Sequence, residues 1–299
     1  MPEPGLTTQC PRYTPFDRLG AIPSLGVWWG VHGRVKGAAV LFHCRGSCVT
    51  LRPVDGWTLS YVIVVVAVAV AAQAVVGFGF ALIAMPLLVL ALDVRDALVL
   101  ATLISLTNTS ILAYTHRANV PWRTVGPMLA GATAGMPVGL ALLLLAPPDA
   151  IRVLVGVSTV AMAAAMVGGL RLRSRSVASE LAIGGVSGAL NTSTGINGPP
   201  VVLYLQGREH PPPEFRGGLA VFFVGSSLVA IVSYAIAGVI AREALVLFAV
   251  SLPAVGAASW VGHHLGDRVD AVLFRRLVYG LLVALAVTAV VSGAVGLAG

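Results

Sequence analysis

Residues 184–205 read GGVSGALNTSTGINGPPVVLYL, an apolar stretch whose middle interrupts a helix. The interruption lies at residues 191–200, where hydroxyl and amide side chains are followed by Gly198, Pro199 and Pro200. Glycine destabilises a helix by about 1 kcal/mol and proline by about 3 kcal/mol, and a proline also disfavours the helical conformation of the residue before it. Open backbone inside a bilayer is tolerated only where protein buries it or it lines a wet cavity. This stretch therefore predicts a broken membrane helix that forms a binding site.

A weaker break of the same kind lies roughly 120 residues earlier in the chain. It reads Gly77-Phe78-Gly79-Phe80 and is followed by Pro86. Broken helices at corresponding positions of two halves are the sequence feature that best indicates a transporter site. We therefore expect the two breaks to act together.

The composition predicts an all-α polytopic membrane protein. Hydrophobic residues make up 57% of the 299 residues and charged residues 10%, and the mean hydropathy is +0.91, whereas soluble domains have about 25% charged residues. A membrane β-barrel would alternate apolar and polar residues, but residues 62–76 contain one polar side chain, Gln73. The net charge of +7 comes from loops between apolar runs, which favours a positive-inside bias over nucleic-acid binding.

Three regions follow from this pattern. Residues 1–56 have scattered prolines and arginines and no helical or strand period, so we expect an unstructured extension, or a translation start later in the chain near Val54. Residues 57–176 and 177–299 form two transmembrane repeats, each of about four helical elements with a broken first helix. The apolar runs judged long enough for membrane segments are 59–76, 80–92, 97–114, 125–146, 151–170, 179–206 with its break, 219–240, 244–261 and 277–297.

The two halves share further features at matching positions. Small residues recur every fourth position in each half, which lets membrane helices approach closely, and Asn108 matches Ser226 in the same alignment of halves. The small residues are Gly131, Gly135 and Gly139 in the first half and Ala254, Ala258 and Gly262 in the second.

The orientation of the repeats depends on whether each broken element crosses the membrane. If each is a hairpin that returns to its own side, the repeats are inverted and most loop arginines share one side, which the positive-inside rule assigns to the cytoplasm. If each crosses fully, the arginines divide almost evenly. The inverted arrangement is the one we expect, in a plasma or inner cell membrane. Its cytoplasmic side holds Arg117, Arg123, Arg171, Arg173, Arg175, Arg208, Arg216, Arg268, Arg275 and Arg276, against Arg95, Arg152 and Arg242 opposite.

The polar residues deep in these segments are neutral, and this favours an anionic substrate. Cation transporters use carboxylates inside the membrane, whereas free N–H groups and the positive end of a helix dipole bind anions. We expect no cofactor, no metal and no enzymatic activity, because no catalytic or four-ligand set is visible. The candidate substrate-binding residues are Asn191, Thr192, Ser193, Thr194, Gly195, Asn197, Gly198, Pro199, Gln73, Gly77, Gly79 and Asn108.

The two broken stretches resemble the paired signatures of the TauE/SafE family of sulfite and organosulfonate exporter-like permeases. The resemblance rests on QAVVGFGFALIAMPLLVL at residues 73–90 and on residues 184–205, and it extends over about residues 57–297. It implies a membrane permease for a small sulfur-containing anion such as sulfite or an organosulfonate.

We therefore expect a transporter that works by alternating access around the two broken helices. The alternative is a membrane-embedded accessory or assembly protein with no transport activity of its own. Proton coupling, the direction of transport and the oligomeric state stay open at this stage.

Overall fold

The computed structural model describes residues 20–22, 27–31, 40–44, 47–50, 56–76, 78–170, 172–208 and 210–266. The chain divides into two compact units, Met1–Leu59 and Ser60–Gly299. Gly77, Arg171, Arg268, Arg275, Arg276 and the last predicted segment at 277–297 lie outside the described residues.

The first unit contains a four-stranded antiparallel sheet with the strand order β1-β2-β3-β4. Residues 1–56 were expected to have no regular structure, and the described part of this region forms these four short strands. The strands are only three to five residues long, and two contain runs of β-branched and aromatic residues, which favour strands. Prolines and glycines between such short runs hide the period from sequence analysis. The strands are β1 (Gly20–Ile22), β2 (Val27–Val31), β3 (Val40–Cys44) and β4 (Ser47–Thr50).

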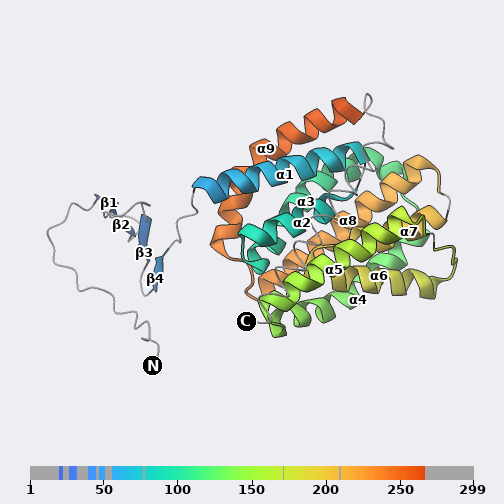
Figure 1. Cartoon of the computed structure of the whole chain (residues 1–299), viewed down its shortest axis with the longest axis horizontal. Helices are drawn as coiled ribbons and strands as arrows, with labels where there is room; N and C mark the ends of the chain where they lie inside the picture. Colours follow the sequence, from blue (N-terminus) through green and yellow to red (C-terminus); the bar gives the residue numbers. More distant parts are fainter. Residues whose placement is uncertain are drawn as a thin grey trace. The chain divides into compact units, whose positions relative to one another are not determined.

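From residue 56 onward, all the regular structure that the described residues form is helical, as the composition predicted (Figure 1). Six of these helices are long and apolar enough to span a membrane: α1, α3, α4, α5, α8 and α9. The helices are α1 (Gly56–Val76), α2 (Phe80–Ala91), α3 (Val94–His116), the short 3-10 helix η1 (Arg117–Asn119), α4 (Trp122–Leu145), α5 (Pro148–Val167), α6 (Val177–Thr194), α7 (Gly198–Gly207), α8 (Pro212–Ile236) and α9 (Arg242–Gly266).

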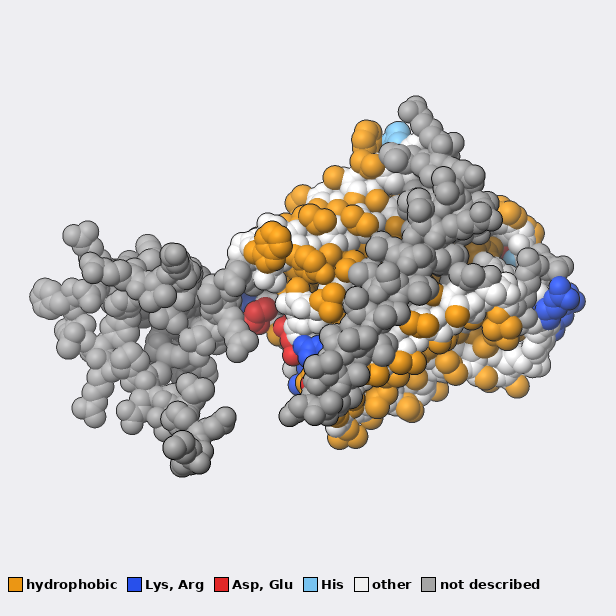
Figure 2. All heavy atoms as spheres, viewed as in Figure 1, with side chains coloured by type: hydrophobic (Ala, Val, Ile, Leu, Met, Phe, Trp, Pro, Cys, Tyr) orange, Lys and Arg blue, Asp and Glu red, His pale blue; other side chains and the backbone are white. Residues whose placement is uncertain are grey.

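The surface of this helical unit is apolar along the helices and charged at their ends. Figure 2 shows hydrophobic side chains spread over the helical face and coloured charges gathered near its two ends. Large apolar side chains such as Ile111, Leu145 and Ile236 are exposed. An apolar face of this extent suits lipid, whereas soluble monomers rarely expose one.

The second broken element, α6–α7, is a hairpin. Helix α7 has ten residues and is therefore about 15 Å long, half the hydrocarbon thickness. The hydroxyl of Tyr204 on α7 lies 3.4 Å from Oε1 of Glu180 in the first turn of α6. The N–H of Leu172, before α6, donates to the carbonyl of Leu203 at 3.3 Å. The ends of α6 and α7 that lie away from the break are therefore together.

The first broken element, α1–α2, folds back in the same way. The Tyr61 hydroxyl, early in α1, donates to the carbonyl of Leu87, late in α2, at 3.0 Å. Helix α2 has twelve residues and is about 18 Å long, too short to cross a bilayer.

Small residues hold each hairpin against a helix of the other half. A Cβ on Gly131, Gly135 or Gly139 of α4 would collide with the backbone of α6 at Leu181, Gly185 or Ala189. A Cβ on Gly262 of α9 would lie 2.6 Å from Cβ of Ala74 on α1, and α9 runs beside α1 in Figure 1. The prediction that these residues serve close helix packing is confirmed at these four glycines.

Candidate functional site

The break at residues 191–200 is a tight turn between two helices. Helix α6 ends at Thr194, Gly195 adopts φ = 74°, and Asn197 precedes the first residue of α7, Gly198. A positive φ of this kind favours glycine. A Cβ on Gly195 would also lie 3.0 Å from Cγ of Met85 on α2, so the turn packs against the other broken element.

The first break has the same construction. Gly79 has φ = 99° and immediately precedes α2 at Phe80. Helix α1 ends at Val76, and Gly77 between them lies outside the described residues. In each half, a glycine in the left-handed region turns the chain and a new helix begins one to three residues later.

Residues of both breaks line one small cavity. The cavity offers about 20 Å³ to the centres of water-sized molecules, enough for about one or two waters. None of the described residues that line it carries a charge. They are Gln73, Phe78, Gly79, Phe80, Ala81, Leu82, Ser105, Ile196, Asn197, Gly198, Pro199 and Phe223.

Free backbone donors surround this cavity. The first N–H groups of a helix have no intrahelical acceptor, and no described residue accepts from those of Phe80, Ala81 or Leu82 at the start of α2. At the second break, the N–H groups of Asn197 and of Gly198, the first residue of α7, are likewise unpaired within the described chain. Pro199 and the residue after it have no N–H. Two positive helix ends thus meet at a site without a formal charge.

Three predicted residues turn away from the cavity. The hydroxyl of Thr192 donates to Met136 O at 2.8 Å, that of Ser193 to Ala189 O at 2.7 Å, and that of Thr194 to Leu190 O at 2.8 Å. None of the three lines the cavity. Their bonds satisfy hydroxyls in an apolar interior and, at Thr192, attach α6 to α4.

The amides of the second break are held by α8. Asn191 Nδ2 donates to the carbonyl of Ser226 at 3.3 Å, and Asn197 Nδ2 donates to the Ser226 hydroxyl at 3.1 Å. The hydroxyl of Tyr234, also on α8, donates to the carbonyl of Asn191 at 3.2 Å. Asn197 lines the cavity, whereas Asn191 lies behind it and braces the turn.

Gln73 and Asn108 form the equivalent pair in the first half. Asn108 Nδ2 donates to Gln73 Oε1 at 2.7 Å, and the Ser259 hydroxyl of α9 donates to Asn108 Oδ1 at 2.7 Å. Gln73 is 4% exposed and lines the cavity, whereas Asn108 does not. Asn108 and Ser226 occupy matching positions in the two halves. Each of them forms hydrogen bonds with an amide side chain of the broken element in its own half.

Several lining residues were not among the predicted ones. Ser105 lies three residues before Asn108 on α3, a spacing that puts both on one helix face, and this signal could have identified it. Phe78, Phe80, Ile196 and Phe223 form the apolar wall. Their sequence pattern does not distinguish them from ordinary core residues.

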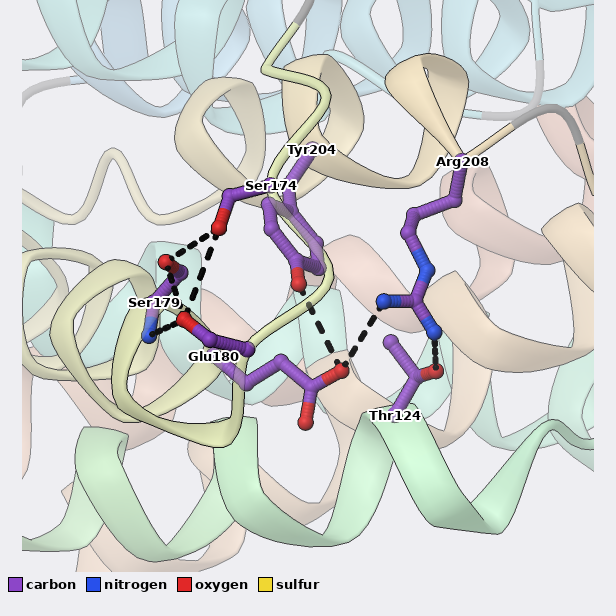
Figure 3. A network of polar contacts seen from close by, with 7 residues as sticks. Thr124, Ser174, Ser179, Glu180, Tyr204 and Arg208 are labelled. Atoms are coloured by element: carbon purple, nitrogen blue, oxygen red, sulfur yellow. Dashed lines mark hydrogen bonds and ion pairs between the residues drawn. The ribbon is translucent and has the colours of Figure 1, made fainter.

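A charged cluster lies at the open end of the second hairpin, away from the break (Figure 3). Glu180 is 3% exposed, and its Oε1 lies 3.5 Å from Arg208 Nη1 at the end of α7. Arg208 Nη2 also donates to the Thr124 hydroxyl of α4 at 3.3 Å. From sequence, Glu180 is only a residue at the start of a segment; the structure buries it and joins α6, α7 and α4 through it.

No group of three or more potential metal-ligating residues occurs within the described part of the chain. The described residues at the cavity contribute neutral side chains and the starts of two helices. The turns at Gly79 and Gly195 bring these groups together.

The comparison with protein families identifies this arrangement. The family described as Sulfite exporter TauE/SafE matches residues 61–289, most of the chain and both broken elements. The chain belongs to the TauE/SafE family. This confirms the resemblance seen in residues 73–90 and 184–205. Comparisons with curated proteins and with solved structures give no match.

Membership of the TauE/SafE family and six apolar helices make this a multi-pass membrane protein of a transporter family. The cavity lies where the two family signatures meet, since residues from both stretches line it.

Proposed function

We propose that this TauE/SafE protein exports a small sulfur-containing anion, such as sulfite or an organosulfonate, across the cell membrane. The observation that carries the proposal is the shared cavity of the two helix breaks, where N–H groups at the starts of α2 and α7 have no acceptor among the described residues. Helix N-termini are suited to bind oxyanions.

The neutrality of the cavity supports an anion over a cation. A desolvated cation needs carboxylates or several carbonyl oxygens, and the lining has no carboxylate. The substrate-binding set that we propose is narrower than the one expected from sequence: Gln73, Gly79, Ser105, Asn197, Gly198 and Pro199, with Asn191 and Asn108 as supports.

The hairpins support an inverted arrangement of the two repeats. If α1–α2 returns to its own side, the three spans α3, α4 and α5 bring the chain to the opposite side before α6–α7 begins. The two hairpins then enter from opposite sides and meet at their tips, as in other transporters with inverted repeats. Alternating access would open the cavity first beside one hairpin and then beside the other.

Membrane voltage is sufficient to drive such export. Moving one negative charge out of a cytoplasm at −100 mV is favourable by about 2.3 kcal/mol. No titratable side chain lines the cavity among the described residues. We therefore propose a voltage-driven facilitator, and proton coupling is the alternative that the experiment below separates from it.

The test is sulfite flux in proteoliposomes under an imposed voltage and, separately, an imposed pH gradient. We expect saturable flux that follows the voltage and falls at least tenfold in Asn197→Leu. Asn119→Leu makes the same chemical change at an exposed residue of η1 and should leave flux unchanged.

Flux driven by the pH gradient alone would show that the protein is a proton-coupled transporter and not a voltage-driven facilitator. If neither sulfite nor a panel of sulfonates and carboxylates moves, the transport proposal fails. The accessory-protein alternative would then be the one to pursue.

A further inference from the structure

Three side chains from three helices form a hydrogen-bonded chain that ends at the cavity. Ser259 of α9 donates to Asn108 Oδ1, and Asn108 Nδ2 donates to Gln73 Oε1, each at 2.7 Å. The first two lie outside the cavity, and Gln73 lines it. The chain thus connects the cavity with a helix of the other half.

The direction of these bonds determines what Gln73 offers to a substrate. Its Oε1 is used by Asn108, so the amide group that remains is Nε2, a donor of two hydrogens. No described residue accepts a hydrogen bond from Nε2. Gln73 is more than nine-tenths buried, so this unpaired donor lies in the protein interior at the cavity wall.

The opposite direction would reverse the chemistry of the site. A hydroxyl can donate or accept. If Ser259 accepted from Asn108 Nδ2, Asn108 Oδ1 would accept from Gln73 Nε2, and the carbonyl oxygen of Gln73 would face the cavity. A carbonyl oxygen repels an anion, whereas an N–H attracts it.

We propose that Ser259 is a positioning residue that fixes the Gln73 amide with its N–H groups toward the bound anion. By donating to Asn108 Oδ1, the Ser259 hydroxyl keeps Asn108 Nδ2 for Gln73 Oε1. This inference rests on the proposed function, because it assumes an anion in the cavity. It assigns a role in anion affinity to a helix none of whose described residues lines the cavity.

The second half has a different arrangement, in which Asn197 at the cavity donates through Nδ2 to the Ser226 hydroxyl, and that hydroxyl donates to the carbonyl of Phe223. Asn191, at the place that matches Gln73, donates to the backbone carbonyl of Ser226 and lies outside the cavity. A backbone carbonyl is only an acceptor, so that contact has a single direction. Of these two matching positions, Gln73 is therefore the one whose amide orientation depends on other side chains.

The experiment measures sulfite KM and maximal flux in proteoliposomes for variants of α9. In Ser259→Ala, Asn108 can adopt either amide orientation. We expect KM to rise about tenfold, the change for one lost hydrogen bond to a charged group, with maximal flux retained. Ser259→Thr keeps the hydroxyl and should keep the wild-type KM. Ser259→Cys, whose thiol is a weak donor, should give an intermediate value.

Ser251→Ala is the matched control, because Ser251 lies on the same helix and its buried hydroxyl has no hydrogen-bond partner among the described residues. Its KM should equal that of wild type. A second readout is the sulfite-induced rise in the unfolding temperature of the purified protein, which should be smaller in Ser259→Ala than in Ser251→Ala. Gln73→Leu should raise KM at least as much as Ser259→Ala.

Two results would overturn the inference while leaving the proposed function intact. One is a wild-type KM in Ser259→Ala; the other is an equal change in Ser259→Ala and Ser251→Ala, which would reduce the effect to helix packing. Failure of wild-type protein to move or bind any anion would instead refute the proposed function itself.

Discussion

Gly79 precedes α2 with φ = 99°, and nothing lies within 4 Å of a Cβ built on it. The cost of Gly79→Ala is therefore backbone strain alone. We expect a loss of about 1–2 kcal/mol in unfolding free energy, the typical cost of the left-handed conformation for a residue with a side chain. Reversible unfolding in detergent or bicelles measures this value.

Gly256→Ala on α9 is the control for that substitution. It also has open space at its Cβ, but no positive φ. Because alanine is the better helix former, this variant should gain about 0.5–1 kcal/mol. Equal effects of the two substitutions would show that the conformation of Gly79 is not strained for alanine.

At the residue scale, the sequence located the helix breaks but identified only some of the residues that line the cavity. The run 191–198 correctly indicated a break that forms a cavity wall, because its composition excludes a continuous helix. It could not tell that Thr192 donates to Met136 O and that Asn197 reaches the cavity. Hydroxyl and amide directions depend on neighbours from α4 and α8, which no local pattern encodes.

The ion pair between Glu180 and Arg208 fastens the open end of the α6–α7 hairpin. Arg208→Met leaves a buried carboxylate whose remaining described partner is the Tyr204 hydroxyl. We expect a loss of about 3–5 kcal/mol in unfolding free energy. The double variant Glu180→Leu, Arg208→Met should recover much of the lost unfolding free energy, because it removes the buried carboxylate as well as its guanidinium partner.

The control for this pair is Arg152→Gln on α5, whose partner Asp149 is about one-third exposed. Solvent-exposed pairs contribute only about 0–1 kcal/mol. A loss from Arg208→Met no larger than that from Arg152→Gln would contradict a structural role for the buried pair.

The close contact of α4 with α6 gives a second prediction for elements. A Cβ on Gly135 would lie 2.8 Å from the carbonyl carbon of Gly185 and collide with its oxygen. Since both partners are backbone, neither can rotate away. Gly135→Ala should therefore lower the unfolding free energy by about 1–3 kcal/mol.

Gly126→Ala tests whether helix propensity explains the result. Gly126 lies on the same helix and has open space at its Cβ, so this variant should be neutral or stabilising. The comparison requires only the unfolding temperatures of both purified variants.

At the element scale, the helices and both breaks could be predicted because apolar length and helix-breaking residues are local properties. The hairpin form was one of two possibilities from sequence. It is apparent from the structure because Tyr204 meets Glu180 and Tyr61 meets Leu87. These contacts join residues more than twenty positions apart, beyond any local signal. The short strands of residues 20–50 were missed for the opposite reason, since their local signal is too short.

For the whole molecule, the inverted arrangement makes a prediction about sidedness. In a background with Cys10, Cys44 and Cys48 changed to serine, single cysteines are placed at Ser174, Pro211 and Pro147, all exposed in loops. If α6–α7 is a hairpin, a membrane-impermeant maleimide should label Ser174→Cys and Pro211→Cys from the cytoplasmic side. It should label Pro147→Cys from the other side.

A continuous crossing of α6 and α7 would group Pro211→Cys with Pro147→Cys. The position of Pro211→Cys in this comparison is therefore decisive for the whole topology. Labelling in intact cells and in permeabilised cells separates the two sides, and permeabilised cells also show that each cysteine can react.

The two helix breaks present different numbers of backbone N–H donors to the cavity, so the two sides of the cavity differ in polarity. Among the described residues that line the cavity, the N–H groups of Phe80, Ala81 and Leu82 at the start of α2 have no described acceptor, whereas at the second break those of Asn197 and Gly198 have none and are followed by the ring of Pro199. If the substrate is an alkyl sulfonate, as proposed, its three head oxygens would face the N–H groups of α2, and its carbon tail would lie toward Pro199 and Phe223. Although the two halves have similar shapes, the cavity would then bind such a molecule in one orientation. The length of the carbon tail would decide which sulfonates are transported.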